Sequence, residues 1–445
     1  MKQRLSLASI LCGILVLLAL PAMAQGPGVP KTLNIDQAVQ YALDRNPTVA
    51  LAQSGVQTSS ARVNGAFGAF LPQISVYGGY SKDLSADEAV IVQGIVIPTT
   101  RPDHSFSAGA TANLTLFDGF GRSASYRSAR NEFESSVQSL EQSRQDIAYQ
   151  TRAAFLNALR DEQLIDVRQS DLDLARERLQ QERDRVSAGA GLATSVYQQE
   201  SDVANSELAL EQARTDLVVA RNSLLLMLNF DPTATVQLSS EGLANSVDSN
   251  EIAESRRQFG TLNDMLERQA QHRRDILAAK LKVESAESQV SVARAGYYPS
   301  ISTSLGWNWQ KAGDFDPSAT TTFALNLQYT PFDGFHTSEQ VQIAEAQRQS
   351  AELELRKLQM ETRSRLEQAL ARLDGAERQL HAAERAVTAS RQSRFSADER
   401  FKAGAGSYTD YLLANSQYLT AQVNQVNAVF NYRLAIYEVK YQIGE

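Results

Sequence analysis

The stretches NLTLFDGF (residues 113–120) and LQYTPFDGF (residues 327–335) decide the fold of this chain, because both end in the same four letters. The two FDGF copies, at 117–120 and 332–335, lie 215 positions apart. Each copy ends a run in which polar and apolar residues alternate, and each begins a long charged stretch. Alternation is typical of a strand, whereas a charged stretch with apolar heptads is typical of a long helix. The chain therefore makes the same strand-to-helix transition twice.

The residues of FDGF suit such a transition. Glycine permits the positive φ of a tight bend, and an aspartate beside it caps or turns the chain. A proline, in turn, begins the first strand of each half. The predicted junction residues are Pro72, Pro299, Asp118, Asp333, Gly119, Gly334, Phe120 and Phe335.

Other motifs repeat as well, which indicates an internal duplication. AGAG occurs at 188–191 and again at 403–406, also 215 positions apart, and FGAFLPQIS around Pro72 matches AGYYPSIS around Pro299. Each half reads as helix, strand, loop, strand, FDGF, long helix, AGAG and helix. We predict a first repeat over 25–230, a linker or equatorial segment over 231–260, and a second repeat over 261–445.

Apolar residues spaced by seven predict that the charged stretches are coiled-coil helices. The first helix would run over 122–186, roughly 65 residues, hence on the order of 100 Å at about 1.5 Å per residue. Flanking helices are predicted over 34–66 and 193–228, each about half as long, so that two of them end to end would lie beside one long helix. The heptad positions are Thr151, Ala158, Ile165, Leu172, Leu179 and Val186 in the first half, and Leu366, Leu373, Leu380 and Val387 in the second.

Four alternating runs predict strands of about ten residues, the length that crosses a bilayer when the strand is tilted. One face of each run is apolar, and the other is small, polar and uncharged, as in the wall of a water-filled lumen. Trp307 and Trp309 lie near one strand end, where an aromatic girdle is expected. Phe120 and Phe335 would then lie where the barrel leaves the membrane on its inner side, at the boundary between lipid and water. The predicted membrane strands are about 70–82, 104–117, 299–310 and 321–332.

The pattern alone leaves a second interpretation open, in which the strands form soluble hairpins with one face on a core. We favour lipid as the partner of the apolar strand faces, because the apolar residues of the coiled-coil helices already pack against one another. Four strands cannot close a barrel, and open edges in lipid leave backbone groups without hydrogen bonds. Two copies would supply eight strands and three would supply twelve, with room for a lumen. The small polar face favours twelve.

The ends and the composition narrow the functional class. Residues 1–24 read as a secretory signal peptide, since Lys2 and Arg4 precede an apolar run and a small-residue cleavage site. Cys12, the only cysteine, lies within it, so the mature chain has no thiolate site. The chain has 43 Lys and Arg against 51 Asp and Glu, which argues against nucleic-acid binding. Because no metal-ligand spacing, phosphate loop or nucleophile elbow occurs, we expect no cofactor, no metal and no enzyme activity.

These motifs, in their order along the chain and in their occurrence in both halves, resemble those of the TolC family of outer-membrane efflux and secretion channel proteins. The resemblance covers nearly all of the chain, from Leu33 to about Ile443. The resemblance implies a mainly α fold with a membrane β-barrel, built from duplicated helix–β-hairpin–helix halves. It implies a homotrimer with a twelve-strand barrel in the outer membrane, four strands per protomer, and a long coiled-coil tunnel in the periplasm. It also implies a periplasmic adaptor (membrane fusion) protein and an inner-membrane transporter as partners. The chain would be a passive channel exporting small molecules or polypeptides.

The resemblance also assigns roles to the helix-hairpin tips. Adaptor docking is implied near Gly189, Gly191, Leu192, Gly404, Gly406 and Ser407. Asp410 matches one position of an acidic ring at the periplasmic aperture, but Leu413 stands where a second acid is expected. Positions matching the polar links of the closed state are Thr194, Ser195, Phe401 and Gly406. Since Phe401 has no hydroxyl and Gly406 no side chain, we expect a looser or more apolar closure.

Two other classes of protein stay open on the sequence. A periplasmic coiled-coil scaffold without a pore would be extracted without detergent. A periplasmic adaptor should carry one helical hairpin between segments of other kinds, whereas this chain has two hairpins.

Overall fold

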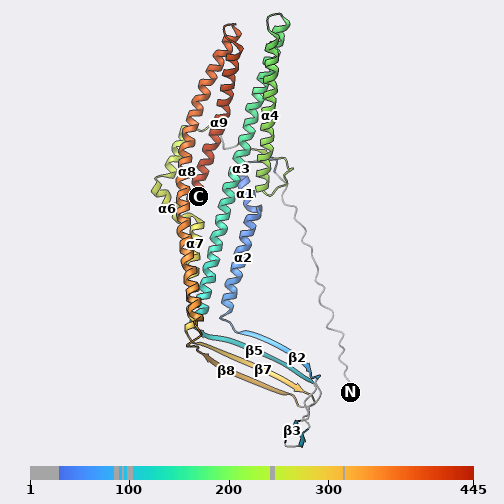
Figure 1. The fold of residues 1–445 in the computed structure, drawn as a ribbon, viewed down its shortest axis with the longest axis vertical. Helices are drawn as coiled ribbons and strands as arrows, with labels where there is room; N and C mark the ends of the chain where they lie inside the picture. Colours follow the sequence, from blue (N-terminus) through green and yellow to red (C-terminus); the bar gives the residue numbers. More distant parts are fainter. Residues whose placement is uncertain (1–29, 85–89, 93–94, 98–103, 241–245, 314–315) are drawn as a thin grey trace.

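The computed structural model describes residues 30–84, 90–92, 95–97, 104–240, 246–313 and 316–445. The molecule is a long bundle of helices that carries a β-sheet at one end and two helical hairpin tips at the other (Figure 1). The predicted signal peptide lies outside the described residues. Among the described helices, none is both long enough and apolar enough to cross a membrane.

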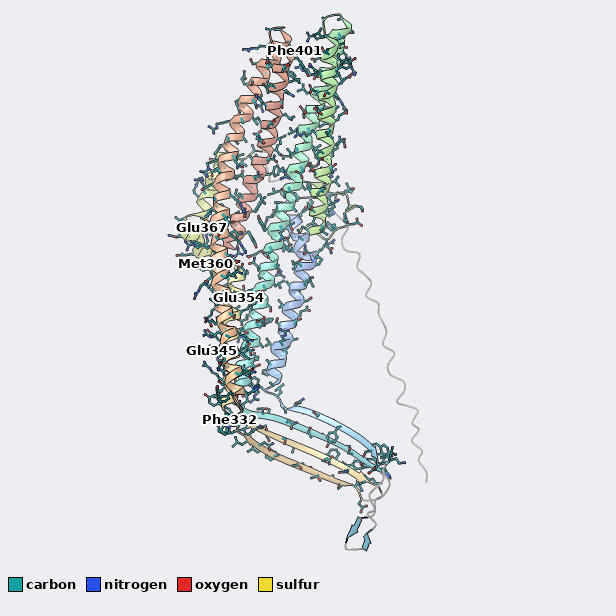
Figure 2. The ribbon with its side chains drawn as sticks, in the orientation of Figure 1. Phe332, Glu345, Glu354, Met360, Glu367 and Phe401 are labelled. Atoms are coloured by element: carbon teal, nitrogen blue, oxygen red, sulfur yellow. The ribbon has the colours of Figure 1, made fainter. Side chains whose placement is uncertain are left out.

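Two helices of equal length form the rods of the bundle. α3 (Gly121–Ser187) and α8 (His336–Lys402) each have 67 residues, and α4 (Ala193–Met227) and α9 (Tyr408–Ile443) return beside them with 35 and 36 residues. Figure 2 shows Phe332 just before the start of α8 and Phe401 at its far end, with Glu345, Glu354 and Glu367 along the rod between them. The matching lengths confirm the predicted duplication.

The predicted heptads pack as expected. Leu366, Leu373, Leu380 and Val387 are all buried, as are Thr151, Ala158 and Leu172 in the first repeat, whereas Ile165, Leu179 and Val186 are only half-buried. The buried side chains form two clusters. One is centred on α3 with α1 and α4, and the other on α8 and α9.

The first flanking helix is not continuous, so the prediction of one helix over 34–66 was wrong. α1 (Ile35–Arg45) ends at Asn46, and α2 (Pro47–Gly68) begins directly after it. Pro47 has no N–H to donate within a helix, and the Asn46 side chain accepts from the N–H of Thr48 at 2.9 Å, which starts a new helix. The second repeat breaks at the equivalent place, at Arg273, but without a proline or a side-chain cap. The break separates α6 (Leu262–His272) from α7 (Arg274–Arg294), and a one-turn helix η1 (Ala295–Tyr297) follows.

As predicted, the flanking helices lie end to end beside the rods. α2 and α4 lie along successive parts of α3, and α7 and α9 lie along successive parts of α8 (Figure 1). The segment between the repeats is not a bare linker. It contains β6 (Gln237–Leu238), which pairs with β1 (Thr32–Leu33), and α5 (Ser249–Phe259), while residues 241–245 lie outside the described part.

Four strands form one antiparallel sheet in the order β2-β5-β7-β8, so strands of the two repeats meet in its centre. The strands are β2 (Gln73–Lys82), β5 (His104–Asp118), β7 (Ser300–Ala312) and β8 (Ser318–Gln328). A short pair, β3 (Val90–Val92) with β4 (Ile95–Ile97), lies beyond the far end of this sheet (Figure 1). β2 and β8 are the two edges, and among the described residues neither pairs with a second strand.

The register gathers the apolar residues of all four strands on one face of the sheet, as the alternation predicts. One row across this face consists of Ile74, Ala112, Leu305 and Phe323, and the next of Val76, Ala110, Trp307 and Thr321. The face is open in the protomer, where Val76 is 80% exposed. A register shift between Thr115 and Phe117 places Phe117, rather than Leu116, opposite Ile301, and Asp118 opposite Ser300.

Candidate functional site

The two FDGF junctions have nearly the same backbone geometry. Gly119 and Phe120 have φ of 66° and 69°, and Gly334 and Phe335 have φ of 68° and 71°. Two consecutive left-handed residues turn each chain out of the sheet, and the phenylalanine is the residue directly before the helix. A non-glycine residue in this region is uncommon and costs free energy, so the bend must be held by its surroundings.

Each junction is held by its aspartate and its pair of aromatic rings. The Asp118 carboxylate accepts from the Arg122 N–H at 2.8 Å, and Asp333 accepts from the Thr337 N–H at 2.8 Å, which caps α3 and α8. Phe117 and Phe120 meet edge to face at 5.4 Å, and Phe332 and Phe335 do so at 5.6 Å. Phe120 and Phe335 are exposed on the protomer surface, beside the strand ends. Pro72 and Pro299 lie directly before β2 and β7.

The helical hairpin tips also match each other. After α3, the Gly189 N–H donates to the Val186 carbonyl at 3.0 Å and the Ala190 N–H to the Arg185 carbonyl at 2.8 Å. After α8, Gly404 and Ala405 make the same two bonds, to Phe401 and Arg400. This is the Schellman motif, in which the residue after the cap takes a positive φ. Gly189 and Gly404 have φ of 74° and 72°.

The second glycine of each tip is needed for a different reason than the first. Gly191 and Gly406 do not have positive φ; instead they pass close to the end of the preceding helix. A Cβ atom at Gly191 would lie 2.9 Å from Val186 Cγ2, and one at Gly406 would lie 3.0 Å from Arg400 Cβ. Leu192 and Ser407 are the residues directly before α4 and α9, and both are exposed at the tips.

Asp410 and Leu413 lie on one exposed side of α9, three residues apart. The Asp410 carboxylate is part of the helix cap: it accepts from the Ser407 N–H at 3.4 Å, and the Ser407 hydroxyl accepts from the Asp410 N–H at 3.1 Å. This capping box fixes the position of the carboxylate at the start of the helix. Leu413 is exposed beside it and adds no charge.

The four positions expected to link neighbouring hairpins are not joined within the protomer. Thr194 and Ser195 belong to the first turn of α4, and among the described residues no hydrogen bond connects them to Phe401 or Gly406. Phe401 instead packs in an aromatic cluster, with ring centroids 5.6 Å from Tyr408 and 6.2 Å from Tyr411. The Arg185 guanidinium of the other hairpin lies 5.4 Å from the Phe401 ring.

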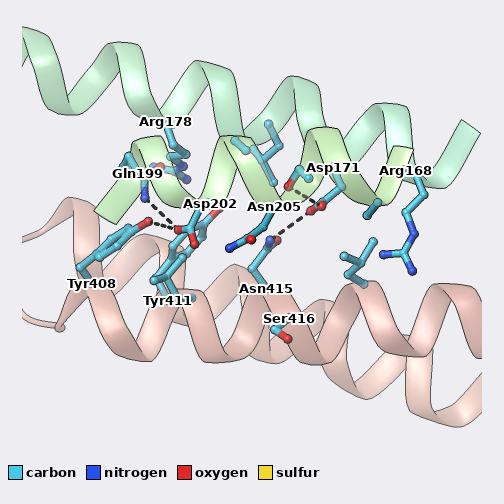
Figure 3. A pocket seen from close by; sticks show the side chains of 16 residues that line it. Arg168, Asp171, Arg178, Gln199, Asp202, Asn205, Tyr408, Tyr411, Asn415 and Ser416 are labelled. Carbon is cyan, nitrogen blue, oxygen red and sulfur yellow. Dashed lines mark hydrogen bonds between the residues drawn. The ribbon is translucent and has the colours of Figure 1, made fainter. Parts of the chain in front are cut away.

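The two hairpins are joined by polar contacts that the sequence did not suggest. The Tyr408 hydroxyl donates to Asp202 at 2.8 Å (Figure 3). Arg178 forms an ion pair with Asp398 of α8. Arg178 also lies over the Tyr411 ring, at 4.6 Å from its centroid. These contacts surround a cavity of about 310 Å³ between α3, α4 and α9. Two further hydrogen bonds lie in this cavity: the Asn415 side-chain amide donates to Asp171 at 3.5 Å, and the Ser206 hydroxyl donates to Asp171 at 3.0 Å.

Burial and the hydrogen bond to Asp202 raise the pKa of the Tyr408 hydroxyl. The hydroxyl is therefore protonated at physiological pH, and only the protonated form can donate a hydrogen bond to the Asp202 carboxylate. No repeated motif could have identified these contacts, because they occur once per protomer. The positions 215 residues after Arg178 and Asp202 are Ser393 and Gln417, which cannot form an ion pair.

The polar face of the sheet is also ordered by side-chain contacts. The Tyr77 hydroxyl donates to Asn308 at 3.0 Å, and Ser81 and Ser105 share a hydrogen bond of 2.7 Å. Between Tyr77 and Asn308 lies Gly109, where a Cβ atom would come within 2.6 Å of the Tyr77 ring. On this face the described strands carry one charged side chain, Asp118 at the helix end of β5, opposite Ser300 and paired with Arg122. Within the described part of the chain, no cluster of His, Cys, Asp or Glu could hold a metal ion.

Comparisons with known proteins agree with this architecture. The family model described as outer membrane efflux protein matches residues 38–229 and 265–438. Protein CyaE of Bordetella pertussis is 25% identical over 321 residues, which cover 70% of this chain and 63% of CyaE. The outer membrane efflux protein BepC of Brucella suis is 23% identical over 313 residues, with coverage of 70% and 63%. The chain thus spans less than two thirds of the length of either curated relative.

Solved structures show the fold. The CmeC outer membrane channel of Campylobacter jejuni superposes with a TM-score of 0.77 at 18% identity, over 92% of this chain and 85% of CmeC. The resemblance to the TolC family is confirmed by the family model, which matches both repeats and most of their length. The chain belongs to the outer membrane efflux protein family.

Proposed function

We propose that this chain is the passive exit duct of a tripartite export system, and that three copies form one channel. As a member of the outer membrane efflux protein family, the protein lies in the outer membrane and extends into the periplasm. In the proposed trimer, three four-stranded sheets close a barrel of twelve strands, and the helical hairpins continue it as a tunnel. The duct performs no chemistry on its cargo.

The observation that carries this proposal is the sheet. Its apolar face is exposed in the protomer, and within the part of the chain that the structure describes, neither edge strand, β2 or β8, pairs with a second strand. An apolar sheet with open edges is unstable in lipid, because every unpaired backbone group there costs several kcal/mol, on the order of the worth of a hydrogen bond in an apolar medium. Pairing β8 of one copy with β2 of the next removes all edges at once. The polar face then lines a lumen.

The helical end supports the choice of partners. The tips around Gly189, Gly191, Leu192, Gly404, Gly406 and Ser407 are the exposed ends of the rods, and we propose that a periplasmic adaptor protein docks there. An inner-membrane transporter would deliver cargo through the adaptor and supply the energy. The cargo is a small molecule or a polypeptide.

We also propose that Asp410 of three protomers forms a ring at the periplasmic aperture, with Leu413 beside it. Three carboxylates near one axis would attract cations and bind polyvalent ones. The capping box with Ser407 supports this role, because it holds the carboxylate in one position. Thr194, Ser195, Phe401 and Gly406 would border the same aperture. Trp307 and Trp309 would belong to an aromatic girdle in the membrane.

A pair of substitutions on neighbouring residues tests the proposal. Val76 lies on the apolar face near the middle of β2, and Ser75 lies on the polar face beside it. Arginine on a lipid-facing strand costs about 2–4 kcal/mol at the bilayer midplane, and a trimer would bear that cost three times. We expect Val76→Arg to lower the yield of heat-modifiable trimers from the detergent-solubilised outer-membrane fraction at least about tenfold. Ser75→Arg is the matched control and should retain the trimer.

The same preparation separates the proposal from its alternatives. Wild-type protein should conduct ions in planar bilayers, and Ser75→Arg should shift the conductance toward anions because it places positive charge in the lumen. A coiled-coil scaffold or an adaptor would instead appear in the soluble periplasmic fraction. Equal trimer yields for Val76→Arg and Ser75→Arg would contradict a lipid-facing apolar face.

A further inference from the structure

We infer that the end of the sheet distant from the helices binds the phosphate group of an anionic membrane lipid, through Lys82 and Lys311 with His104 between them. The inference deepens the proposed function and rests on it, because the apolar face of the sheet must lie in lipid for such a headgroup to reach these residues. It names the chemistry of one lipid and the residues that select it.

The charges of the sheet are segregated by end. Within β2, β5, β7 and β8, the basic residues are Lys82, His104 and Lys311, all at the end distant from the rods. The carboxylate of these strands, Asp118, lies at the opposite end, and it is paired with Arg122. The basic residues of these four strands therefore all lie at one end of the sheet.

The register places the three basic residues on the apolar face. Lys82 lies directly opposite His104, and Lys311 lies directly opposite Phe106. Phe106 and His104 are two residues apart on β5, so they share a face with the two lysines. Lys82 and Lys311 lie on β2 and β7 with β5 between them, so their backbones are two strand spacings apart, roughly 10 Å, and two residues out of register. Both lysine side chains must extend toward β5 to share one anion. The three groups can thus converge on one anion of the size of a phosphate.

An aromatic band lies immediately beside this basic cluster. The Tyr80 and Phe106 rings are 5.0 Å apart between centroids, and the His104 ring meets Phe106 edge to face at 6.0 Å. Trp309 lies in the next row toward the rods, opposite Ala108. Aromatic residues gather where acyl chains give way to headgroups, and the ammonium groups of lysines beyond them extend into the headgroup layer. The cluster is therefore continuous with the surface that meets lipid.

The two lysines favour an anion. Among the described residues, neither Lys82 nor Lys311 forms an ion pair with a carboxylate. Six carboxylates lie near these strand ends in the sequence, at Asp83, Asp87, Glu88, Asp103, Asp314 and Asp316; the structure describes Asp83 and Asp316 among them. Lysine binds phosphate as a compact point charge, whereas an uncharged sugar or choline headgroup would leave both ammonium groups without a partner. A phosphorylated lipid is thus the occupant that fits.

Intrinsic fluorescence can test this directly, because Trp307 and Trp309 are the two tryptophans of the chain and both lie on this face. The purified full-length trimer in neutral detergent is titrated with diphosphoryl lipid A, and in parallel with the same glycolipid after both phosphates are removed. EDTA is present throughout, so that divalent ions cannot bridge the nearby carboxylates to the phosphates. Wild-type protein should bind the phosphorylated lipid, with saturation, at least about tenfold more tightly than the dephosphorylated one, since each lysine near an anionic surface contributes.

The variant Lys82→Gln/Lys311→Gln should lose this preference while it keeps the trimer. The matched control is Lys280→Gln/Lys282→Gln, which removes the same charge from exposed positions of α7 and should bind as wild type does. Equal affinity for both glycolipids, or an unchanged preference in Lys82→Gln/Lys311→Gln, would overturn the inference. Competition by inorganic phosphate at the same concentration as the lipid would overturn it too, since the site would then take free phosphate. If wild-type protein forms neither trimers nor pores, it is the proposed function that fails.

Discussion

At the scale of single residues, the junction between strand and helix depends on backbone conformation more than on side-chain chemistry. Each FDGF copy places a glycine and a phenylalanine in succession at φ near 70°. The glycine adopts this conformation without strain, whereas the phenylalanine does so at a cost of roughly 1–2 kcal/mol. The aspartate cap and the edge-to-face rings offset that cost. The two copies nevertheless differ in what surrounds their glycines.

This difference yields a prediction. A Cβ atom at Gly119 would lie 2.7 Å from the Ala295 carbonyl oxygen, whereas one at Gly334 would have no neighbour within 4 Å. Gly334→Ala should cost about 1–2 kcal/mol for the positive φ alone. Gly119→Ala should cost more, because backbone must also move. The temperature at which the trimer dissociates on heating in detergent should therefore fall further for Gly119→Ala. Equal shifts would show that the contact with Ala295 has no consequence.

At the scale of elements, each hairpin is fixed by its heptad seam and its Schellman turn, but the relation between the two hairpins depends on a few polar contacts near the tips. Tyr408 to Asp202 and Arg178 to Asp398 join them across a cavity rather than through a packed seam. A small number of such contacts can be broken without unfolding either hairpin. The tips are therefore the part of the rods best able to separate.

Tyr408→Phe tests this idea. It keeps the ring among Phe401 and Tyr411 but removes the hydroxyl, which leaves the half-buried Asp202 with only a 3.5 Å contact from Gln199. Loss of a hydrogen bond to a charged group costs about 1.5–3 kcal/mol, so we expect the hairpins to separate more often and single-channel conductance to rise. Tyr418→Phe, elsewhere on α9, should leave the conductance unchanged. Unaltered conductance in both variants would contradict a role for this contact.

The same contact should not respond to pH near neutrality. Because the pKa of Tyr408 is raised in the folded protein, its contribution to stability is complete below the unfolded value of about 10 and is lost as the pH rises through the folded value. Wild-type and Tyr408→Phe channels should thus keep a constant difference in conductance between about pH 6 and pH 9.

At the scale of the whole molecule, the two repeats are held together by a buried polar cluster at mid-length. Arg273, fully buried at the break between α6 and α7, donates to Asp275 at 2.6 Å and to Gln442 of α9 at 2.7 Å. Tyr441 stacks on Tyr149 of α3 with centroids 4.8 Å apart and donates to Asp146 at 2.6 Å. Burial, together with this hydrogen bond, raises the pKa of Tyr441 to about 12. The cluster thereby connects α3 of the first repeat to the α6–α7 break and to α9, which are the first and last parts of the second repeat in sequence.

Removal of Arg273 should destabilise the whole protomer. In Arg273→Met the stem is replaced by an apolar chain, and Asp275 and Gln442 lose their partner inside the bundle. Breaking a buried charged pair costs about 3–5 kcal/mol, so the denaturant midpoint of the helical signal should fall sharply. Arg378→Met removes an exposed guanidinium from α8 and serves as the control, with a change of at most about 0.5 kcal/mol. A similar small change for Arg273→Met would show that the cluster is dispensable.

The sequence by itself determined the features that depend on local order along the chain. Strand faces follow from alternation with period two, rods from heptads, and the duplication from FDGF and AGAG at a constant offset, so each could be derived before any contact was known. The break at Asn46 and Pro47 was also within reach, because a proline preceded by asparagine starts a helix. Only the tertiary structure decided which strands meet at the centre of the sheet and which side chains join the hairpins.

The physical reason is that such contacts join residues far apart in the chain and occur once. Tyr408 and Asp202 are 206 positions apart and have no counterpart in the other repeat, so no spacing or periodicity indicates them. Lys82, His104 and Lys311 are equally unremarkable in the sequence, and they form one cluster only because the register of β2, β5 and β7 aligns them on one face. Local pattern determines what each element is, whereas the packing of distant elements decides which residues act together.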